Sequence, residues 1–565
     1  MKLTQMREVT MNKKTIISIA CVTFLLIGLN LSAQDTINDV IYNFSDYKPE
    51  IKDAFKVSER PTVIKPTEKK PDIQYVNQPK RIDTKFEVEP ISAAKMSGEP
   101  LTKLYKSLIK IGYGPYQTPM AEVYFNNGRS KKHSLGFSYR HLSSNGKIEN
   151  VGFPGYSMNL LNGNAEKYFK NHTFKSNISW NRNVVHYYGF DTRKFTDIKN
   201  DEIKQRFSLS EIKNTYYSTY TNHDKLNHKI NLNYYNLFDM FKTFENNVSF
   251  AADLDKEINL DADMQDEKIG LLIEADYNNL SNTKDTLSDG IIKIIPTVSF
   301  KANDITIKGG VKAIVEADTT SYLRFFPCID VNLQIAENIL MVYGGIDGNV
   351  QKNSFRSLST ENPFINPLVE YANTREKLYA YFGLKGNINS KISFNANLSS
   401  HNMINMAMYT ADTSELLHNR FNVIYDDVKY LKASGEIAYQ KNEKIKILIG
   451  GEYNNYQTSK EAYAWYKPTI AGKIAAEYNI QDKIITKAEL YYLGQTYGKN
   501  YDTTLNTSYR INKAAFDFNI GIEYRYSKIL SAFVNFNNIV AVRHYPWLNY
   551  PKQKFNLIGG ITYSF

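Results

Sequence analysis

The chain has 565 residues, of which 42% are hydrophobic and 22% charged, and a formal net charge of +11. Its mean hydropathy of -0.44 excludes a polytopic helical membrane protein, which needs repeated apolar runs of about 20 residues, and its 42 Tyr and 30 Phe exclude a disordered chain. Two cysteines, Cys21 and Cys328, provide neither a disulfide framework nor a thiolate metal cage, so a large soluble protein or a β-barrel remains.

The first 33 residues have the organisation of a secretory signal peptide. A pair of lysines precedes an apolar stretch over residues 15–29, and small residues follow it. This order predicts cleavage between Ala33 and Gln34. A lipoprotein cysteine at Cys21 is the alternative, but the apolar stretch continues beyond it, which favours an ordinary signal peptide. The mature protein is therefore expected outside the cytoplasm.

Residues 34–103 form a proline-rich segment. It holds seven of the 17 prolines in the chain, with lysines and glutamates between them. Because proline lacks a backbone donor and fixes φ, neither a long helix nor a central strand is expected here. Two interpretations stay open: an extended periplasmic linker, or a segment that occludes a barrel lumen or docks on a partner.

From residue 104 onwards, apolar and polar residues alternate repeatedly. Residues 516–526 (FDFNIGIEYRY) place Phe, Ile and Tyr on one face and Asp, Asn, Glu and Arg on the other, and residues 392–399 and 472–479 follow the same pattern. The runs last roughly 10–14 residues, which exceeds the usual strand of a soluble sandwich and suits a tilted bilayer crossing. Residues 104–565 are therefore predicted to form an all-β fold, a transmembrane antiparallel β-barrel.

Turns and loops set the strand count. Short junctions alternate with longer connections, which is typical of a barrel with short periplasmic turns and longer extracellular loops. The short junctions are Asn303-Asp304, Glu337-Asn338, Asn389-Ser390, Asn442-Glu443, Gln481-Asp482 and Ser527-Lys528, and longer connections lie at 351–375, 404–419, 499–512 and 543–554. Strands upstream of the first junction are expected at 104–114, 119–127, 132–141, 169–181, 184–190, 209–221, 226–238, 243–255, 267–279 and 289–302. Twelve more bring the total to about 22 strands (20–22).

Tyrosine pairs lie near the ends of several of these runs, at 187–188, 216–217, 234–235 and 491–492. Tyrosine combines an apolar ring with a polar hydroxyl, so it is favoured at the level of the lipid headgroups. Ordinary cross-strand packing is the alternative explanation. We expect aromatic girdles at both membrane interfaces.

The last 50 residues resemble a known family. After 516–526 come 530–539 (LSAFVNFNNI), 547–551 (WLNYP) and 558–565 (IGGITYSF). This succession resembles the carboxyl end of TonB-dependent receptor barrels of the Bacteroidetes type. The resemblance implies an outer-membrane protein involved in transport. It also implies that Tyr563 and Phe565, in the closing strand, form the signal that the outer-membrane assembly machinery recognises during insertion.

The chain departs from that family on its amino-terminal side. Such receptors carry a larger plug domain, whereas residues 34–103 are proline-rich and have no plug-like pattern. Plug-based energy coupling is therefore not expected. A 22-stranded lumen exceeds that of the 16–18-stranded porins, so something is expected to fill it: residues 34–103, inward-folded loops at 142–168 and 351–375, or a partner protein.

Motifs for enzyme chemistry are missing from the sequence: it has no nucleotide-binding glycine loop, zinc-protease motif, paired cysteine motif or nucleophile elbow. No enzyme activity and no cofactor are therefore expected. Asp261, Asp263 and Asp266 are weak candidates for a Ca²⁺ site, but they lack EF-hand spacing, and a solvated turn is the alternative. Cations on lumen faces, such as Lys473 and Arg525, favour anionic solutes or lipopolysaccharide phosphates. An exported barrel is not expected to bind nucleic acid.

Two functions stay open, and an enzyme built on an outer-membrane barrel is disfavoured because no nucleophile–base pair is evident. In the first, the protein is a transport barrel that passes or gates a solute without plug-based coupling. In the second, it is a structural or scaffold subunit of an outer-membrane complex, in which residues 34–103 recruit periplasmic partners or other envelope proteins. Neither hypothesis identifies a substrate.

Overall fold

The computed structural model describes residues 105–128, 130–220, 225–258, 264–317, 321–442, 444–501 and 507–565. The predicted signal cleavage between Ala33 and Gln34 and the proline-rich segment 34–103 lie outside these residues. Two of the three candidate metal ligands, Asp261 and Asp263, also lie outside them. The predicted signal cleavage, the role of residues 34–103 and the candidate metal site therefore stay predictions from the sequence.

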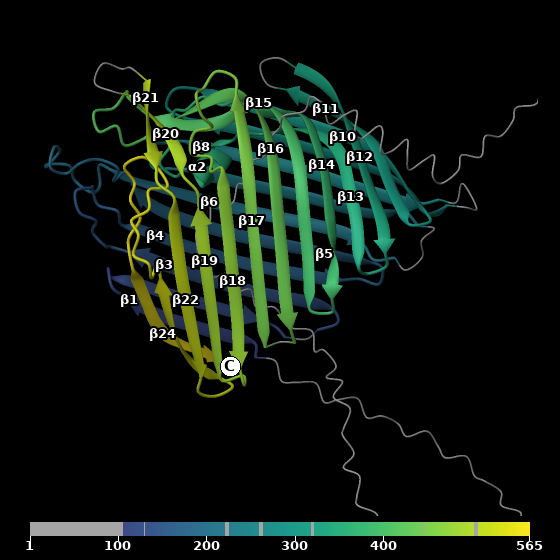
Figure 1. Cartoon of the computed structure of the whole chain (residues 1–565), viewed down its shortest axis with the longest axis horizontal. Helices are drawn as coiled ribbons and strands as arrows, with labels where there is room; N and C mark the ends of the chain where they lie inside the picture. Colours follow the sequence, from purple (N-terminus) through teal and green to yellow (C-terminus); the bar gives the residue numbers. More distant parts are fainter. Residues whose placement is uncertain are drawn as a thin grey trace, which may run out of the picture. The chain divides into compact units, whose positions relative to one another are not determined.

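The described residues form twenty-four strands, and twenty-two of them close into one antiparallel barrel (Figure 1). The strands are β1 (Ser107–Gly114), β2 (Thr118–Asn126), β3 (His133–Ser144), β4 (Tyr156–Tyr168), β5 (His172–His186), β6 (Lys204–Ser218), β7 (Asn227–Phe238), β8 (Phe244–Glu257), β9 (Gln265–Ser281), β10 (Thr286–Ala302), β11 (Ile305–Ala317), β12 (Ser321–Ala336), β13 (Leu340–Gln351), β14 (Thr374–Asn389), β15 (Ile392–Ala411), β16 (Phe421–Lys441), β17 (Ile445–Thr458), β18 (Ile470–Ile480), β19 (Ile484–Leu493), β20 (Thr496–Tyr501), β21 (Thr507–Asn512), β22 (Ala515–Arg525), β23 (Leu530–Asn537) and β24 (Asn556–Ser564). β19 pairs directly with β22, so β20 and β21 form a hairpin outside the ring.

The first and last strands close the ring. β1 pairs antiparallel with β24 from Leu108↔Ser564 to Tyr113↔Gly559. Every strand of the ring is therefore paired on both sides, which a lipid-embedded sheet requires because bilayer hydrocarbon offers no hydrogen-bond partner to a free edge. The predicted fold class and strand number are confirmed.

The predicted positions of the fourth and fifth strands were wrong. Residues 142–168, expected to be a loop, contain β4, and the two strands expected at 169–181 and 184–190 are the single strand β5. The two errors cancel in the count. β4 escaped detection because its lipid face carries small residues such as Gly163 and Ala165, while Leu160 lies on the other face, so apolar and polar residues do not alternate.

The predicted periplasmic turns occur where the polar junctions lie. Asn303, Asn338 and Asn442 adopt positive φ angles of 53°, 58° and 55° in the turns after β10, β12 and β16. Asparagine tolerates this left-handed region better than most residues, which explains its recurrence there. At the other rim, the expected loop 404–419 is shorter than predicted, because β15 continues to Ala411 and β16 begins at Phe421.

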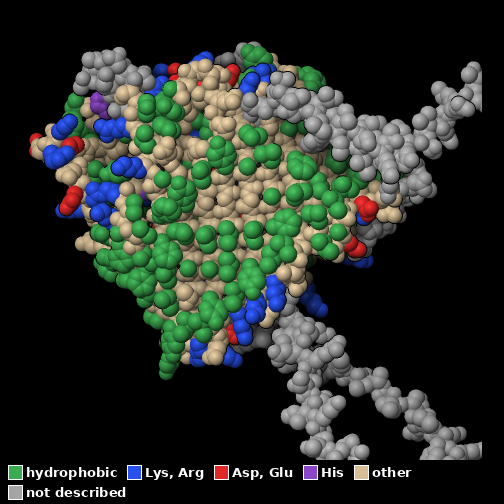
Figure 2. Space-filling view, in the orientation of Figure 1, with side chains coloured by type: hydrophobic (Ala, Val, Ile, Leu, Met, Phe, Trp, Pro, Cys, Tyr) green, Lys and Arg blue, Asp and Glu red, His purple; other side chains and the backbone are tan. Residues whose placement is uncertain are grey.

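The two faces of the wall differ as predicted. Phe516, Ile522 and Tyr524 of β22 are exposed on the outer face, and Lys487 and Glu477 pair on the inner face at 3.4 Å. Figure 2 shows hydrophobic side chains spread over the wall around β16–β19, with charged side chains mostly towards the margins. The one helix among the described residues is the short α2 (Phe355–Glu361), and no helix there is long and apolar enough to cross a membrane.

The closing pair of strands is sensitive to side-chain size. A Cβ atom at Gly560 would collide with the backbone of Ile111 on β1, whereas a Cβ at Gly309 of β11 would meet nothing within 4 Å. We expect Gly560→Ala to destabilise closure by about 1–3 kcal/mol through overpacking, and Gly309→Ala to be neutral. The check is the fraction of protein that keeps the compact electrophoretic mobility of a folded barrel when it is not heated. Equal folded fractions for the two variants would contradict this account of the seam.

Candidate functional site: the lumen and its extracellular cap

A long connection at the extracellular rim carries the helix α2. Residues 352–373, which we call the cap segment, join β13 to β14 (Figure 1). Ser354 begins the helix with a capping box: its hydroxyl accepts the N–H of Ser357 (3.2 Å), and the Ser357 hydroxyl accepts the N–H of Ser354 (2.9 Å). The local sequence therefore specifies where α2 starts within an otherwise irregular loop.

One side of α2 is bound to the wall formed by β6, β7 and β8. The Arg356 guanidinium donates to Glu211 of β6 at 2.8 Å and lies 4.3 Å from the ring centroid of Tyr235 on β7. The Arg356 N–H donates to Glu245 of β8 at 3.0 Å. Phe355 is fully buried next to Phe207 of β6. Charge-assisted hydrogen bonds and apolar contact thus act at the same anchor.

The other side of α2 is bound to a different part of the ring. Glu361 accepts a hydrogen bond from the Tyr409 hydroxyl of β15 (3.1 Å) and pairs with Lys467 in the β17–β18 loop (2.6 Å). The Tyr409 hydroxyl also lies 3.3 Å from the carbonyl oxygen of Leu358. Strands β9–β14 stand between β8 and β15, so the cap segment crosses the extracellular mouth from one wall to another.

Four other extracellular loops pack against the cap segment: β5–β6, β15–β16, β17–β18 and β23–β24. Ile365 forms a bridge with Phe421, and its carbonyl accepts from the Tyr187 hydroxyl at 3.2 Å. Phe364 stacks on Tyr550 of the β23–β24 loop with ring centroids 3.8 Å apart. The buried apolar cluster shared by these elements includes Tyr187, Phe190, Phe355, Leu358, Phe364, Ile365, Met406, Met408, Tyr409, Phe421, Trp465, Leu548 and Tyr550. These loops together form a packed extracellular cap rather than separate surface loops.

The inner wall below the cap carries cations paired with acids. Most pairs join neighbouring or next-neighbouring strands, so they span the wall rather than project freely. They include Lys312–Asp347 (2.6 Å), Lys432–Glu452 (3.2 Å), Lys487–Glu477 (3.4 Å) and Lys293–Glu274 (3.5 Å). Lys352, at the start of the cap segment, contacts both Asp276 and Asp289. The lining is therefore polar but largely charge-compensated.

A row of stacked aromatic rings follows the inner wall across β14–β16. Tyr379 stacks on Tyr381 (4.9 Å) and on His401 (4.5 Å), and His401 stacks on Tyr430 (4.6 Å). His401 and Tyr430 are only 2% and 0% exposed. The faces of these two rings are covered by their neighbours in the row, so this part of the row stabilises the wall and does not offer ring faces to a solute.

Of the three candidate metal ligands, only Asp266 lies among the described residues. Asp266 lies near the start of β9 with a φ of 53°, and no group of three or more His, Cys, Asp or Glu side chains occurs there with metal-binding geometry. The two lumen cations that were expected to attract anionic solutes already contact other side chains of the wall. Lys473 lies 5.0 Å from the centroid of the Tyr491 ring, and Arg525 lies 3.8 Å from Glu523.

The two residues of the predicted assembly signal lie in the closing strand and just after it. The rings of Tyr563 and Phe565 stack at 5.6 Å and both are exposed. Of the two loops expected to fold inward, 351–375 does cross the mouth, whereas 142–168 contains β4. Sequence reasoning missed the anchors Arg356 and Glu361. The signal that points to them is the Ser-x-x-Ser capping box inside a long loop.

No family model matches this chain, and no curated protein matches it. Solved structures do. The FrpB iron transporter from Neisseria meningitidis (F3-3 variant) matches with a TM-score of 0.62 at 11% identity, over 82% of each chain. The ferric-catecholate import receptor Fiu from K12 E. coli gives 0.62 at 9% identity, also over 82% of each chain. The structure of the FpvAI–pyocin S2 complex gives 0.62 at 10% identity, over 83% of this chain and 74% of that one.

These structural neighbours are TonB-dependent receptors, which are built on 22-stranded outer-membrane barrels. At identities of 9–11% the likeness shows the fold. The chain therefore has the same fold as these barrels.

The Arg356 anchor can be tested without touching the wall. In Arg356→Leu, Glu211 loses its bond to the cap segment, which removes a charge-assisted hydrogen bond of about 1.5–3 kcal/mol. We expect backbone amides of residues 357–362 to exchange hydrogen roughly 10- to 100-fold faster. The matched control is Arg193→Leu, since Arg193 pairs with Asp191 at 2.8 Å within an extracellular loop and does not contact the cap segment. Unchanged exchange in Arg356→Leu would show that this anchor does not hold the cap.

A second anchor is predicted to depend on pH. Asp412, in the β15–β16 loop, accepts hydrogen bonds from Asn366 of the cap segment (2.7 Å) and from Ser414 (2.9 Å). Burial raises the pKa of the Asp412 carboxyl, but the hydrogen bonds from Ser414, Asn366 and Asn422 outweigh burial and hold the pKa below its usual range. A depressed pKa means that the anchor is at full strength above the ordinary Asp pKa of about 4 and weakens as the pH falls below it.

We therefore expect the protection of amides 363–370 against hydrogen exchange, corrected for the intrinsic rate, to stay constant from pH 8 to pH 5. Below about pH 4 the protection should fall. Asp412→Asn, which cannot titrate, should remove this acid-dependent step. A step of the same size in Asp412→Asn would assign the pH dependence to another group.

Proposed function

We propose that this protein is a transport barrel of the outer membrane, related to TonB-dependent receptors of the Bacteroidetes type, in which extracellular loops rather than a displaced plug control access to the lumen. The cap segment is the observation that carries the proposal. It is anchored on β6–β8 and on β15, and other loops pack against it over a shared apolar cluster. Opening the lumen from outside therefore requires this segment to move.

The inner wall favours a polar solute. Several of its lysines are paired with carboxylates at 2.6–3.5 Å, so a strongly charged solute would have to displace existing pairs. Two of the solved structures of this fold are named as an iron transporter and a ferric-catecholate import receptor. An iron chelate of low net charge is therefore the first substrate class to test for this chain.

A scaffold function is the second candidate, and the proline-rich composition of residues 34–103 favours it. In that case the segment recruits periplasmic or other envelope proteins, and the barrel serves as its membrane anchor. Under either function, the barrel contacts outer-membrane lipid and lipopolysaccharide. The exposed rings of Tyr563 and Phe565 support their proposed recognition by the assembly machinery.

The cap can be tested by conductance in planar bilayers. We expect the intact protein to show little steady current, and a variant in which residues 354–371 are replaced by a short Gly/Ser link to show a large ohmic conductance, because the crossing segment is gone. Equivalent replacement of residues 282–285, the extracellular β9–β10 loop, is the control, since the hydrogen bonds and the ion pair of these residues stay within that loop. A large, steady and unblocked current through the intact protein would refute occlusion of the lumen.

Deletion of residues 34–103 separates the two functions. If the segment fills the lumen, its loss should increase permeability of the outer membrane to large antibiotics, measured as a fall in the inhibitory concentration of vancomycin. If it recruits partners, the permeability barrier should stay intact while envelope proteins no longer co-purify with the barrel.

Uptake of labelled iron chelates by cells with and without the protein tests transport directly.

A further inference from the structure

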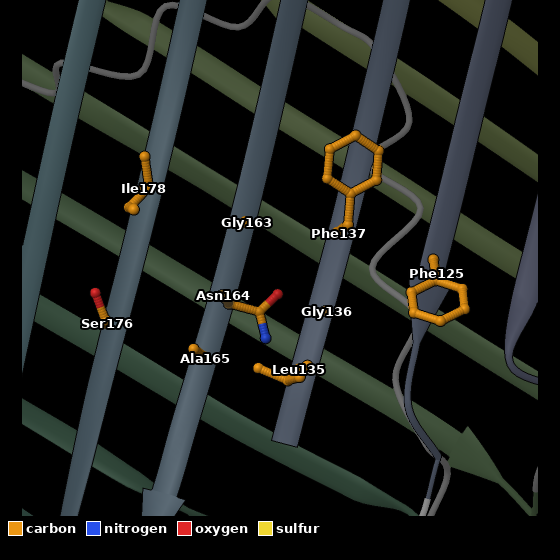
Figure 3. A pocket seen from close by; sticks show the side chains of 9 residues that line it. All are labelled: Phe125, Leu135, Gly136, Phe137, Gly163, Asn164, Ala165, Ser176 and Ile178. Carbon is orange, nitrogen blue, oxygen red and sulfur yellow. The ribbon is translucent and has the colours of Figure 1, made fainter. Parts of the chain in front are cut away.

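A groove opens on the outer face of the barrel, away from the lumen and the cap. It has a volume of about 330 Å³ and is lined by residues of β2–β5: Phe125, Leu135, Gly136, Phe137, Gly163, Asn164, Ala165, Ser176 and Ile178 (Figure 3). The size falls within the ~300–1,000 Å³ range of small-molecule sites. Phe125, Leu135 and Ile178 are 49%, 47% and 54% exposed, so the groove faces the hydrocarbon of the membrane.

The groove exists because β4 has small side chains on its outer face. Gly163 and Ala165 form the floor, and Ser176 of β5 lies beside them. Larger side chains on both flanks, Phe137 on β3 and Ile178 on β5, form the walls (Figure 3). A linear apolar chain fits such a depression better than the flat neighbouring wall does, because it gains contact on three sides.

The periplasmic end of the groove is basic. Lys167 follows Ala165 by two residues on β4, so both lie on the outer face about 7 Å apart. His133 of β3 pairs in register with Lys167. Lys131 and Lys132 lie in the β2–β3 turn and Lys170 in the β4–β5 turn, and these three lysines and Lys167 are exposed. Together Lys131, Lys132, Lys167 and Lys170 form the lysine collar.

No acid on the outer face opposes the collar in this part of the described chain. The one acidic residue between 165 and 175 is Glu166, which alternates onto the lumen face and pairs with Lys175 at 3.0 Å. Among the described residues, none of the four collar lysines forms an ion pair. An apolar groove therefore ends in an uncompensated positive surface at the height where lipid headgroups begin.

We propose that this groove is a binding site for an anionic phospholipid of the periplasmic leaflet. One acyl chain lies over Gly163 and Ala165 between Phe137 and Ile178, and the phosphate contacts the lysine collar. The apolar groove fits the acyl chain and the lysine collar fits the phosphate of the same lipid molecule, because the collar lies at the end of the groove that faces the headgroup layer. Neither the transport nor the scaffold function requires this site, so a test of lipid binding in the groove does not depend on which function the protein has.

The test is native mass spectrometry of the full barrel purified in mild detergent, with added phosphatidylglycerol or phosphatidylethanolamine of identical acyl chains. We expect the anionic lipid to be retained at least fivefold more than the zwitterionic one, with the preference falling as salt rises. Ala165→Phe should reduce retention of the anionic lipid at least fivefold by filling the groove. Ala476→Phe, on the outer face of β18, is the matched control and should have no effect.

A second variant protects the test against misfolding of Ala165→Phe. Replacing all four collar lysines by Glu leaves the groove intact and should abolish the preference for the anionic lipid while retaining the folded mobility of the barrel. Equal retention of the two lipids by the unmodified protein would overturn the proposal. So would equal retention of the anionic lipid by Ala165→Phe and Ala476→Phe. Loss of a co-purifying membrane protein in Ala165→Phe, without loss of lipid, would assign the groove to a protein partner and also overturn it.

Discussion

The hydrogen-bonding capacity of the backbone is the constraint on which this structure depends. In bilayer hydrocarbon an unpaired N–H or C=O costs several kcal/mol, so a sheet can cross only if it has no free edge. The register between β1 and β24 meets that condition, and the glycines at the seam allow the two backbones to approach. Alternation of lipid-facing and lumen-facing side chains follows directly, because a closed sheet has one face in each environment.

Closure creates a second requirement. A ring of 22 strands encloses a space too wide for its own wall side chains to fill, and barrels of this size are plugged. Here the extracellular loops fold together over the mouth. The cap combines apolar burial around Phe355 and Tyr409 with ion pairs at Arg356 and Glu361. Buried pairs of this kind add directional preference to the apolar contacts, and they provide discrete points at which a ligand or a change in pH can weaken the closed arrangement.

The outer wall is not uniform, and β4 shows why this matters. Most strands present large aliphatic or aromatic side chains to lipid, but β4 presents Gly163 and Ala165. Because these two residues are small, β4 lacks the apolar–polar alternation by which strands are recognised in a sequence. They also create the groove between the larger side chains of β3 and β5. A strand that fails the usual pattern is therefore the place where the wall acquires a specific shape.

The amino-acid sequence by itself determined the barrel, the number of strands and the side of the short turns. Each of these depends on local features: the two-residue period of a strand and the tolerance of asparagine for positive φ at Asn303, Asn338 and Asn442. The location of β4, the stacked row through His401 and the anchors of the cap were not accessible in this way. Arg356 and Glu361 are five residues apart in the chain, yet their partners lie on β6 and on β15, on separate parts of the ring. Only the tertiary structure decided these contacts, because closure of the barrel brings together loops that no local pattern relates.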